Sequence, residues 1–163
     1  VTGNLVIGAD GSGSVGIGTA SPITALDVHH DPTSLSNDTG GGEVVLFGGG
    51  TTGAGRLYYL HTDGNWAATD ADGVADGADQ LLAIALGTTP GTHGMLIRGF
   101  ADIAADLSNF SPGKAVYISD NPAGSMDTVA PAGSGDFVRV VGWCTTTANV
   151  IYFNPSGDWV ELA

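Results

Sequence analysis

The chain has 163 residues, of which 27 are glycine, 17 are acidic and only four are lysine or arginine, so its formal net charge is −13. Four cations cannot neutralise a phosphate backbone or an anionic lipid surface, which disfavours nucleic-acid binding and membrane docking. The sequence has no apolar run long enough to span a bilayer and no signal-peptide pattern. Its single cysteine, Cys144, excludes disulfide-rich and cysteine-ligated zinc classes. Because the sequence starts at Val1 and not at methionine, we expect a piece of a longer polypeptide.

Short apolar triplets alternate with glycine, serine, aspartate and threonine over residues 1–28. They fall at residues 5–7, 15–17 and 26–28. A three-residue strand buries little apolar area and glycine costs backbone entropy, so such a segment is weakly stable alone. We therefore expect three copies to wrap around one axis, with each short strand pairing with its neighbours and the apolar side chains pointing inward.

The next segment, residues 29–42, reads HHDPTSLSNDTGGG and is predicted to be a linker or an ordered loop. From residue 43 onward the pattern is that of short strands separated by turns. The predicted strands are residues 44–47, 56–60, 65–68, 81–86, 95–100, 115–119, 137–144, 150–153 and 159–162. The Asp63-Gly64 turn joins the second and third of these into a hairpin. Only residues 101–107 could form a helical turn or two.

This spacing predicts an all-β fold, a compact β-sandwich or barrel head preceded by a β stem or arm. No strand–helix alternation is present, which disfavours a doubly wound α/β fold. We expect two parts, a glycine-rich stem and linker over residues 1–42 and a head over residues 43–163. Hydrophobic residues make up 42% of the chain, enough for such a core.

One stretch resembles a known family. The sequence VGIGTASPITALDV at residues 15–28, preceded by VTGNL at residues 1–5, is similar to the VGIGTxSPxxxLDV element of bacteriophage tail fibres and related phage appendage proteins. The head also looks similar, more loosely, to terminal β-domains of phage structural proteins. The resemblance implies a homotrimeric virion appendage with a stem and a distal head.

The densest acidic segment is DADGVADGAD, with Asp70, Asp72, Asp76 and Asp79. A calcium loop needs oxygen ligands at alternating positions and a bidentate acid near the twelfth. Only the opening of that pattern is present, so we expect a solvated acidic loop, with a cation site as the open alternative. No metal site is assigned.

Other side chains with chemical potential do not form a catalytic pattern. The histidines, His29, His30, His61 and His93, lack metal-ligand spacing, although a histidine on a three-fold axis would be present three times. No serine lies in a nucleophile-elbow motif. Cys144 lies in an apolar strand and is expected to be buried and inert. We therefore expect no enzyme, no catalytic residue and no cofactor.

Arginine and aromatic residues offer the remaining hypotheses for binding. Arg98 and Arg139 lie within apolar strands, so each is expected to find a carboxylate partner, with receptor binding as the alternative. Aromatic side chains could stack on sugar rings, although core or interface packing is the default for them. The candidates by type are Tyr58, Tyr59, Trp66, Tyr117, Trp143, Tyr152 and Trp159. Alternation predicts that either Tyr58 or Tyr59 is exposed, and Trp66, beside a turn, is the tryptophan most expected at the surface.

These observations together predict a bacteriophage structural protein, located in the virion, that acts as a trimeric fibre in attachment to the host surface. The expected partners are further copies of the chain, other virion proteins, and a host-surface glycan or protein. The ligand-binding residues are not identified. The main alternative is a capsid decoration protein or head fibre whose N-terminal arm docks on the shell. A glycan-degrading enzyme and a non-phage filament protein are further alternatives.

Overall fold

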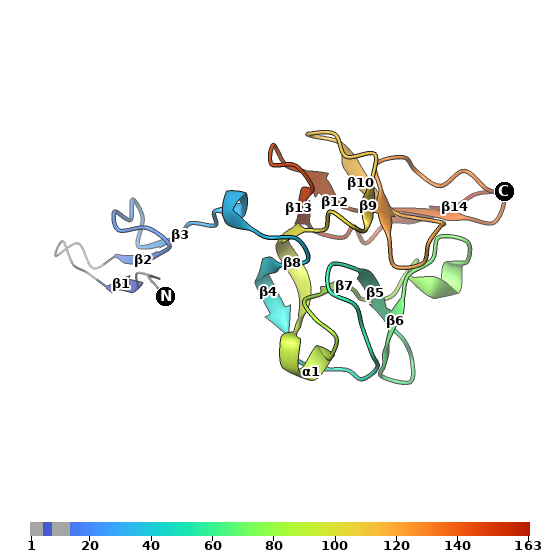
Figure 1. Cartoon of the computed structure of the whole chain (residues 1–163), viewed down its shortest axis with the longest axis horizontal. Helices are drawn as coiled ribbons and strands as arrows, with labels where there is room; N and C mark the ends of the chain where they lie inside the picture. The colour runs from blue at the N-terminus through green and yellow to red at the C-terminus, as the bar shows by residue number, and fades with distance from the viewer. Residues whose placement is uncertain (1–4, 8–13) are drawn as a thin grey trace. The chain divides into compact units, whose positions relative to one another are not determined.

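The computed structural model describes residues 5–7 and 14–163, and the side chains from residue 14 onward. The chain divides into two compact units, Val1–Ser34 and Leu35–Ala163 (Figure 1). The division lies earlier than the boundary expected after residue 42, because residues 40–42 pair with a strand of the larger unit. Among the described residues, no helix has the length and apolar character to cross a membrane.

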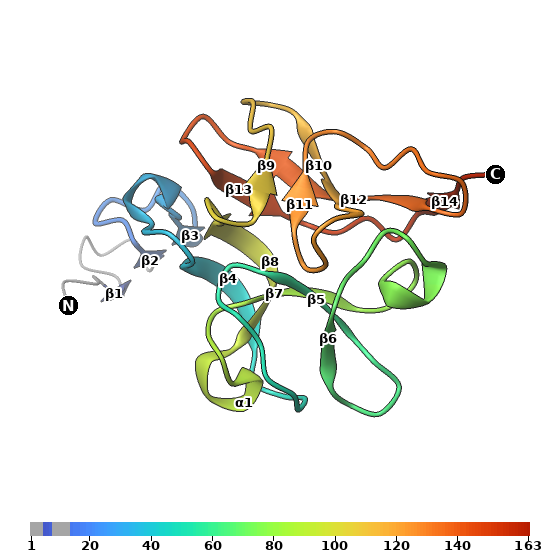
Figure 2. The ribbon, with the colours of Figure 1, turned by 45° about the vertical axis from the view of Figure 1, so that its right-hand side comes forward.

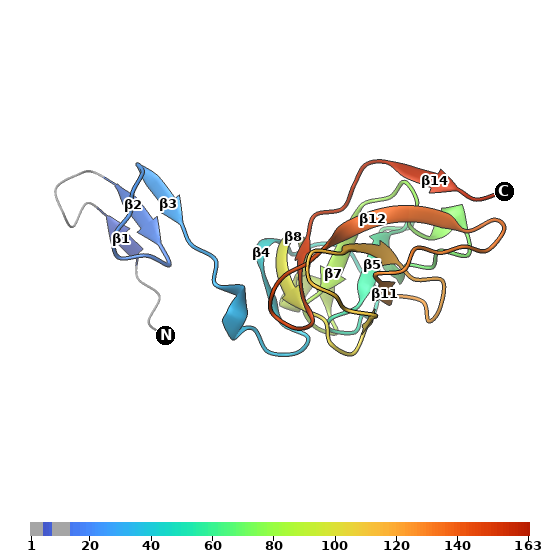
Figure 3. The same cartoon turned by 90° about the horizontal axis from the view of Figure 1, so that it is seen from above.

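The small unit contains the three apolar triplets as three short strands (Figure 3). They are β1 (Leu5–Ile7), β2 (Val15–Ile17) and β3 (Leu26–Val28). β1 pairs antiparallel with β2, and β2 pairs parallel with β3. The strands therefore lie where the sequence predicts them, and within this single chain they pair with one another. The expectations that concern residues 1–4 and 8–13 lie outside the described residues.

The motif at residues 15–28 has a local structural explanation in this unit. Gly18 has φ +77°, and a Cβ there would lie 2.4 Å from the carbonyl oxygen of His29, so only glycine fits. The Thr19 hydroxyl accepts a hydrogen bond from the amide of Ser21, at 3.2 Å. The Asp27 carboxylate accepts one from the amide of Ile23, at 3.0 Å. These bonds hold the crossover loop between β2 and β3.

The large unit is all-β and consists of one sheet that curls into a half-barrel. Its path runs β6-β5-β7-β8-β13-β12-β10-β11-β9, with β4 added beside β8 and β14 beside β12 (Figure 2). The first strands are β4 (Gly40–Val45), β5 (Leu57–Leu60), β6 (Trp66–Ala68), β7 (Leu82–Ala85) and β8 (Met95–Asp102). The later strands are β9 (Leu107–Ser108), β10 (Ala115–Ile118), β11 (Met126–Asp127), β12 (Phe137–Cys144), β13 (Val150–Phe153) and β14 (Trp159–Glu161). Eight of the nine strands predicted for the head are confirmed in position to within two residues, whereas the strand predicted at residues 44–47 lies earlier, as β4 at residues 40–45. The two-residue strands β9 and β11 were not predicted.

β8 joins the two halves of the sheet. The first half of β8 pairs with β7 and the second half with β13, while β4 runs along the opposite edge of β8 (Figure 2). Gly42 and Gly99 face each other in this β4–β8 ladder, with φ +148° and +147°. A Cβ on Gly99 would lie 2.2 Å from the carbonyl oxygen of Gly41, so the two strands approach this closely only because both positions are glycine.

Short helices occupy connections and differ from the prediction. They are η1 (Pro32–Ser34), η2 (Val74–Asp76) and α1 (Pro90–His93). The predicted helical turn at residues 101–107 is wrong, because β8 extends through Asp102 and a turn leads directly into β9. Pro90 starts α1 because proline favours the first helical position, and Gly94 ends it. Residues 40–42, expected in the linker, are strand.

The core lies on both faces of the sheet in the β5–β7 region. One apolar cluster fills the concave side and includes Leu57, Tyr59, Leu82, Ile84, Leu96, Ile118, Phe137, Ile151 and Phe153. A second cluster covers the other face and includes Tyr58, Trp66, Ala83, Ala85 and Met95. Every residue of β7 is consequently buried. The half-exposed sheet that strand alternation assumes is therefore absent in this region.

Two predictions of exposure are wrong for this reason. Trp66 is only 3% exposed, and both Tyr58 and Tyr59 are buried, at 6% and 5% exposure. The segment that follows β4 packs over Trp66 and Tyr58, whereas Tyr59 points to the opposite face and is buried in the concave-side cluster. The Phe47 ring lies 5.8 Å from the Trp66 ring, and the Phe47 carbonyl accepts the Trp66 indole N–H at 2.8 Å. The amide of Gly53 donates to the Tyr58 hydroxyl at 2.7 Å.

Candidate functional site

Three aromatic residues form a row across the outer face of the sheet. Phe100 on β8 is the register partner of Tyr152 on β13, and Tyr152 is the register partner of Trp143 on β12. Directly paired residues of antiparallel strands share one face, so the three side chains lie side by side. Their chain neighbours Ala101, Ile151 and Cys144 point to the opposite face and are buried in the core. We call Phe100, Tyr152 and Trp143 the aromatic row.

The row combines ring surface with two charged side chains. Trp143 is 42% exposed, and the Phe100 and Tyr152 ring centroids lie 5.2 Å apart. Arg98, exposed on β8, donates from Nε to the Tyr152 hydroxyl at 3.2 Å. This hydrogen bond, together with the nearby charge of Glu43, raises the pKa of Arg98. Glu43, also exposed, is the register partner of Arg98 on β4. A donor and an acceptor therefore flank the rings at one end.

The row contains two of the seven aromatic candidates from the sequence, Trp143 and Tyr152. Trp159, by contrast, packs edge-on against Phe137, with ring centroids 6.2 Å apart. Phe100 was not predicted as a site residue. The sequence offered a signal for it, because residues 98 and 100 are two positions apart in the predicted strand 95–100, and alternation places Phe100 on the same face as Arg98.

Neither arginine predicted to pair with a carboxylate has a carboxylate ion pair among the described residues. Arg98 binds the Tyr152 hydroxyl. Arg139 is only 7% exposed and donates to four backbone carbonyl oxygens. Its Nε bonds Ser156 at 2.8 Å, and its Nη1 bonds Gly77, Ala78 and Gln80 at 2.8, 3.0 and 2.9 Å. The prediction is wrong because a loop with free carbonyl groups, not a side chain, closes over the guanidinium.

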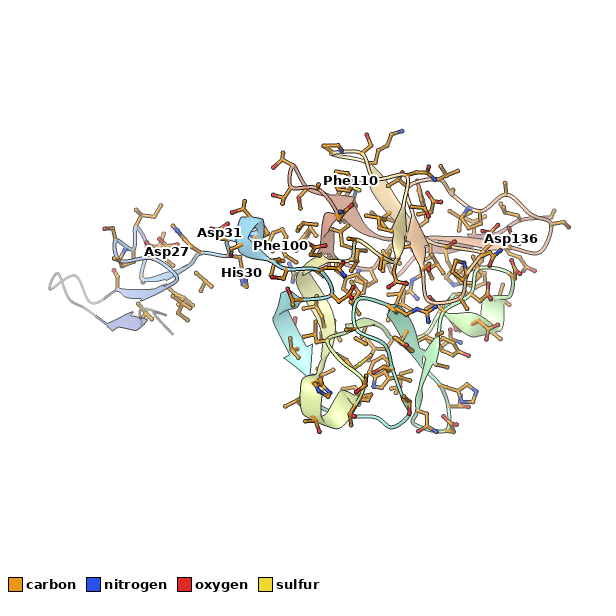
Figure 4. The ribbon with its side chains drawn as sticks, in the orientation of Figure 1. Asp27, His30, Asp31, Phe100, Phe110 and Asp136 are labelled. Atoms are coloured by element: carbon orange, nitrogen blue, oxygen red, sulfur yellow. The ribbon has the colours of Figure 1, made fainter. Side chains whose placement is uncertain are left out.

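An acidic cluster forms at another part of the large unit, where three loops meet. Carboxylate oxygens of Asp72, Asp120 and Asp136 all lie within 4.8 Å of one another. The loops are tied together by backbone bonds from Ala71 to Ser119, at 3.1 Å, and from Phe137 to Ala71, at 2.9 Å. Figure 4 shows Asp136 at the end of the large unit away from Phe100. The acidic cluster is thus separate from the aromatic row.

The cluster differs from the predicted acidic loop in its members. Of the four aspartates in residues 70–79, only Asp72 belongs to it. Asp70 accepts a hydrogen bond from the Asp72 amide, at 3.2 Å. The Asp76 carboxylate accepts a hydrogen bond from the Tyr59 hydroxyl at 2.9 Å. The pKa of Tyr59 is raised to about 12, mainly by burial and further by this hydrogen bond. Within the described part of the chain, this cluster is the one group of three potential metal-ligating side chains.

Substituting Asp72→Asn is expected to raise the free energy of unfolding at neutral pH, because like charges crowd this carboxylate. The charge of Asp70, followed by desolvation and the charges of Asp136 and Asp120, raises the pKa of Asp72 above 3.8. The folded state thus holds the proton more tightly than the unfolded state. The wild-type protein regains stability as the pH falls from the raised pKa toward 3.8, so the advantage of the variant shrinks there.

Urea unfolding with a chelator present, at neutral pH and at about pH 4, measures this effect. Asp158→Asn, which removes the same charge from an exposed residue outside the cluster, is the control. Equal effects of the two substitutions at both pH values would contradict the prediction.

The remaining candidates have ordinary structural roles. Cys144 is 5% exposed, as predicted, and burial raises the pKa of its thiol, which disfavours the reactive thiolate. His29 lies 3.1 Å from Asp27, and His61 lies 2.9 Å from Asp63, each a local contact. A small hollow of about 250 Å³ lies beside Asp120 and is lined by Ser119, Asp127 and residues 129–132.

Known protein families, curated proteins and solved structures give no match to this chain. The site is therefore interpreted from its own chemistry. One exposed ring, Trp143, beside two half-buried rings and an adjacent guanidinium and carboxylate can bind a ligand that has both apolar faces and hydroxyl groups. They supply no nucleophile with a positioned base.

Proposed function

We propose that this chain is a structural protein of a bacteriophage virion, a homotrimeric fibre or appendage that attaches the particle to the host surface. The resemblance of residues 15–28 to the tail-fibre element supports this identity. The positive φ of Gly18 and the hydrogen bonds accepted by Thr19 and Asp27 give that element a defined local fold. The aromatic row on the large unit supports an attachment role.

The surface of the small unit supports assembly with further copies. Four of its apolar side chains remain substantially exposed, at 47% for Ile17, 88% for Ile23, 62% for Leu26 and 45% for Val28. A short unit that leaves this much apolar surface in water gains stability when copies cover it. This exposed apolar surface is the observation that supports self-association, and the number of three copies comes from the resemblance to the tail-fibre element.

The large unit offers a second place for assembly. β4 pairs with β8 along one edge, and within the described residues no strand pairs with its other edge. Leu46 and Phe47, directly after β4, are 64% and 43% exposed. An open edge beside apolar side chains is prone to pair with another chain.

The substitution Leu26→Asp is expected to dissociate the trimer into monomers. Burial of a leucine contributes about 1.5–3 kcal/mol, so placing a charge there weakens assembly by at least about tenfold per copy. The absolute mass by light scattering over a concentration series measures the change. Ala20→Asp, which adds the same charge at an exposed position of the small unit, is the control and should leave the mass unchanged.

Two experiments test the proposed function as a whole. The intact chain should have the mass of a trimer and should bind host cells. Binding to empty capsids with no binding to cells would replace the attachment role by capsid decoration. A stable monomer at all concentrations would overturn both roles.

A further inference from the structure

We propose that the aromatic row, with Arg98 and Glu43, is a binding site for a neutral saccharide. The inference rests on the proposed attachment function and gives it a ligand class and a location. The site has three components: ring faces that can stack on a sugar, a hydrogen-bond donor and a hydrogen-bond acceptor.

The rings are arranged to contact a linear ligand. Phe100, Tyr152 and Trp143 occupy adjacent register positions on three neighbouring strands. Strands lie about 4.8 Å apart, so the row extends over about 10 Å, close to the length of a disaccharide. The C–H groups on one face of a pyranose carry partial positive charge, and the faces of aromatic rings carry partial negative charge, so the two attract. Trp143, 42% exposed, offers the largest of the three ring systems.

The polar side chains match the hydroxyl groups of a sugar. Arg98 and Glu43 are register partners on β8 and β4, and both are exposed. The Tyr152 hydroxyl accepts the Arg98 Nε–H at 3.2 Å, which fixes the guanidinium next to the rings. An arginine donates and a carboxylate accepts, so the pair can bind two neighbouring hydroxyl groups, one as acceptor and one as donor.

The negative net charge of the protein and the balanced charge of the site favour a neutral ligand. The chain carries a net charge of −13, and at this site Glu43 lies opposite Arg98, so the site has no excess of positive charge. An acidic polysaccharide or a nucleic acid would be repelled by the protein as a whole. A neutral saccharide has no such penalty.

Affinity electrophoresis of the full chain through gels that contain dextran, mannan or galactan tests the proposal, with alginate as the anionic probe. We expect at least one neutral polysaccharide, and not alginate, to retard the wild-type protein. Trp143→Ala should weaken that binding about tenfold or more, as for the loss of a central aromatic contact. Arg98→Gln, which keeps the rings, should weaken it to a smaller extent.

Leu81→Ala is the matched control, because Leu81 is a large apolar residue of almost equal exposure, 44%, outside the row and outside the proposed assembly surfaces. It should leave saccharide binding unchanged. The proposal is overturned if no neutral polysaccharide retards the protein or if Trp143→Ala binds like the wild type. It is also overturned if Trp143→Ala changes the mass of the assembly, since the row would then be an interface between copies.

The same variants separate this proposal from the proposed function. If the wild-type and Trp143→Ala trimers attach to host cells equally well, the attachment function stands and the saccharide site is overturned. If the protein is a monomer that binds a neutral polysaccharide through Trp143, the saccharide site stands and the proposed trimeric fibre is overturned.

Discussion

Arg139→Met is expected to lower the free energy of unfolding by about 3–5 kcal/mol, through the loss of several hydrogen bonds from a charged donor, which is a large part of the stability of a domain of this size. Arg139 is only 7% exposed, and its guanidinium donates to the carbonyl groups of Gly77, Ala78, Gln80 and Ser156. Methionine fills similar space but donates no hydrogen bond. It would leave these carbonyl groups without their donor, at about 1–3 kcal/mol for each one that water does not reach.

Urea unfolding followed by tryptophan fluorescence measures this loss. Arg139→Lys retains the charge but not the planar fork, so it should fall between the methionine variant and the wild type. Arg98→Met is the control, because the same substitution at an exposed arginine should change stability by at most about 0.5 kcal/mol. Equal stability of the Arg139→Met and Arg98→Met variants would show that the loop carbonyl groups do not depend on Arg139.

Gly99→Ala is expected to destabilise the protein by about 3 kcal/mol, because alanine is both strained and obstructed there. The backbone φ at Gly99 is +147°, which L-residues rarely adopt, and the added Cβ would lie 2.2 Å from the carbonyl oxygen of Gly41 and 2.8 Å from the Cα of Gly42. Both obstacles are backbone atoms and cannot rotate away. Gly99 also pairs with Phe153 on β13, so a shift would affect both neighbours of β8.

The chain offers a closely matched control for this variant. Gly41 belongs to β4, the strand against which Gly99 packs, and a Cβ at Gly41 would meet no atom within 4 Å. Gly41→Ala should therefore leave the urea midpoint nearly unchanged, and the difference between the two variants measures the close approach itself. If both variants lose the same stability, the contact between β4 and β8 is not the cause.

The two candidate sites differ in how they arise. The aromatic row depends on the register of three strands that are consecutive neighbours in the sheet, although β8 lies far from β12 and β13 in the sequence. The acidic cluster depends on three loops brought together by the backbone bonds of Ala71. Asp72 belongs to the acidic segment singled out from the sequence. Asp120 and Asp136 lie at least 48 residues further along the chain, so no local pattern links them to Asp72.

The sequence by itself determined the all-β class, the positions of the main strands and the burial of Cys144. Strand positions follow from local alternation and from turn residues such as Asp63-Gly64, which act over a few residues and need no knowledge of the rest of the chain. The three triplets of residues 5–7, 15–17 and 26–28 were recognisable as strands for the same reason.

Only the tertiary structure decided which faces are covered and which side chains meet. Trp66 and Tyr58 are buried because the segment after β4 folds over a face that local alternation leaves exposed, while Tyr59 lies in the apolar cluster on the opposite face. Arg139 found carbonyl groups, not a carboxylate, because a loop about sixty residues earlier in the chain closes over it, as the separation of 62 from Gly77 shows. Burial and partner choice depend on packing between residues distant in sequence, and a one-dimensional pattern contains no information about which of them become neighbours.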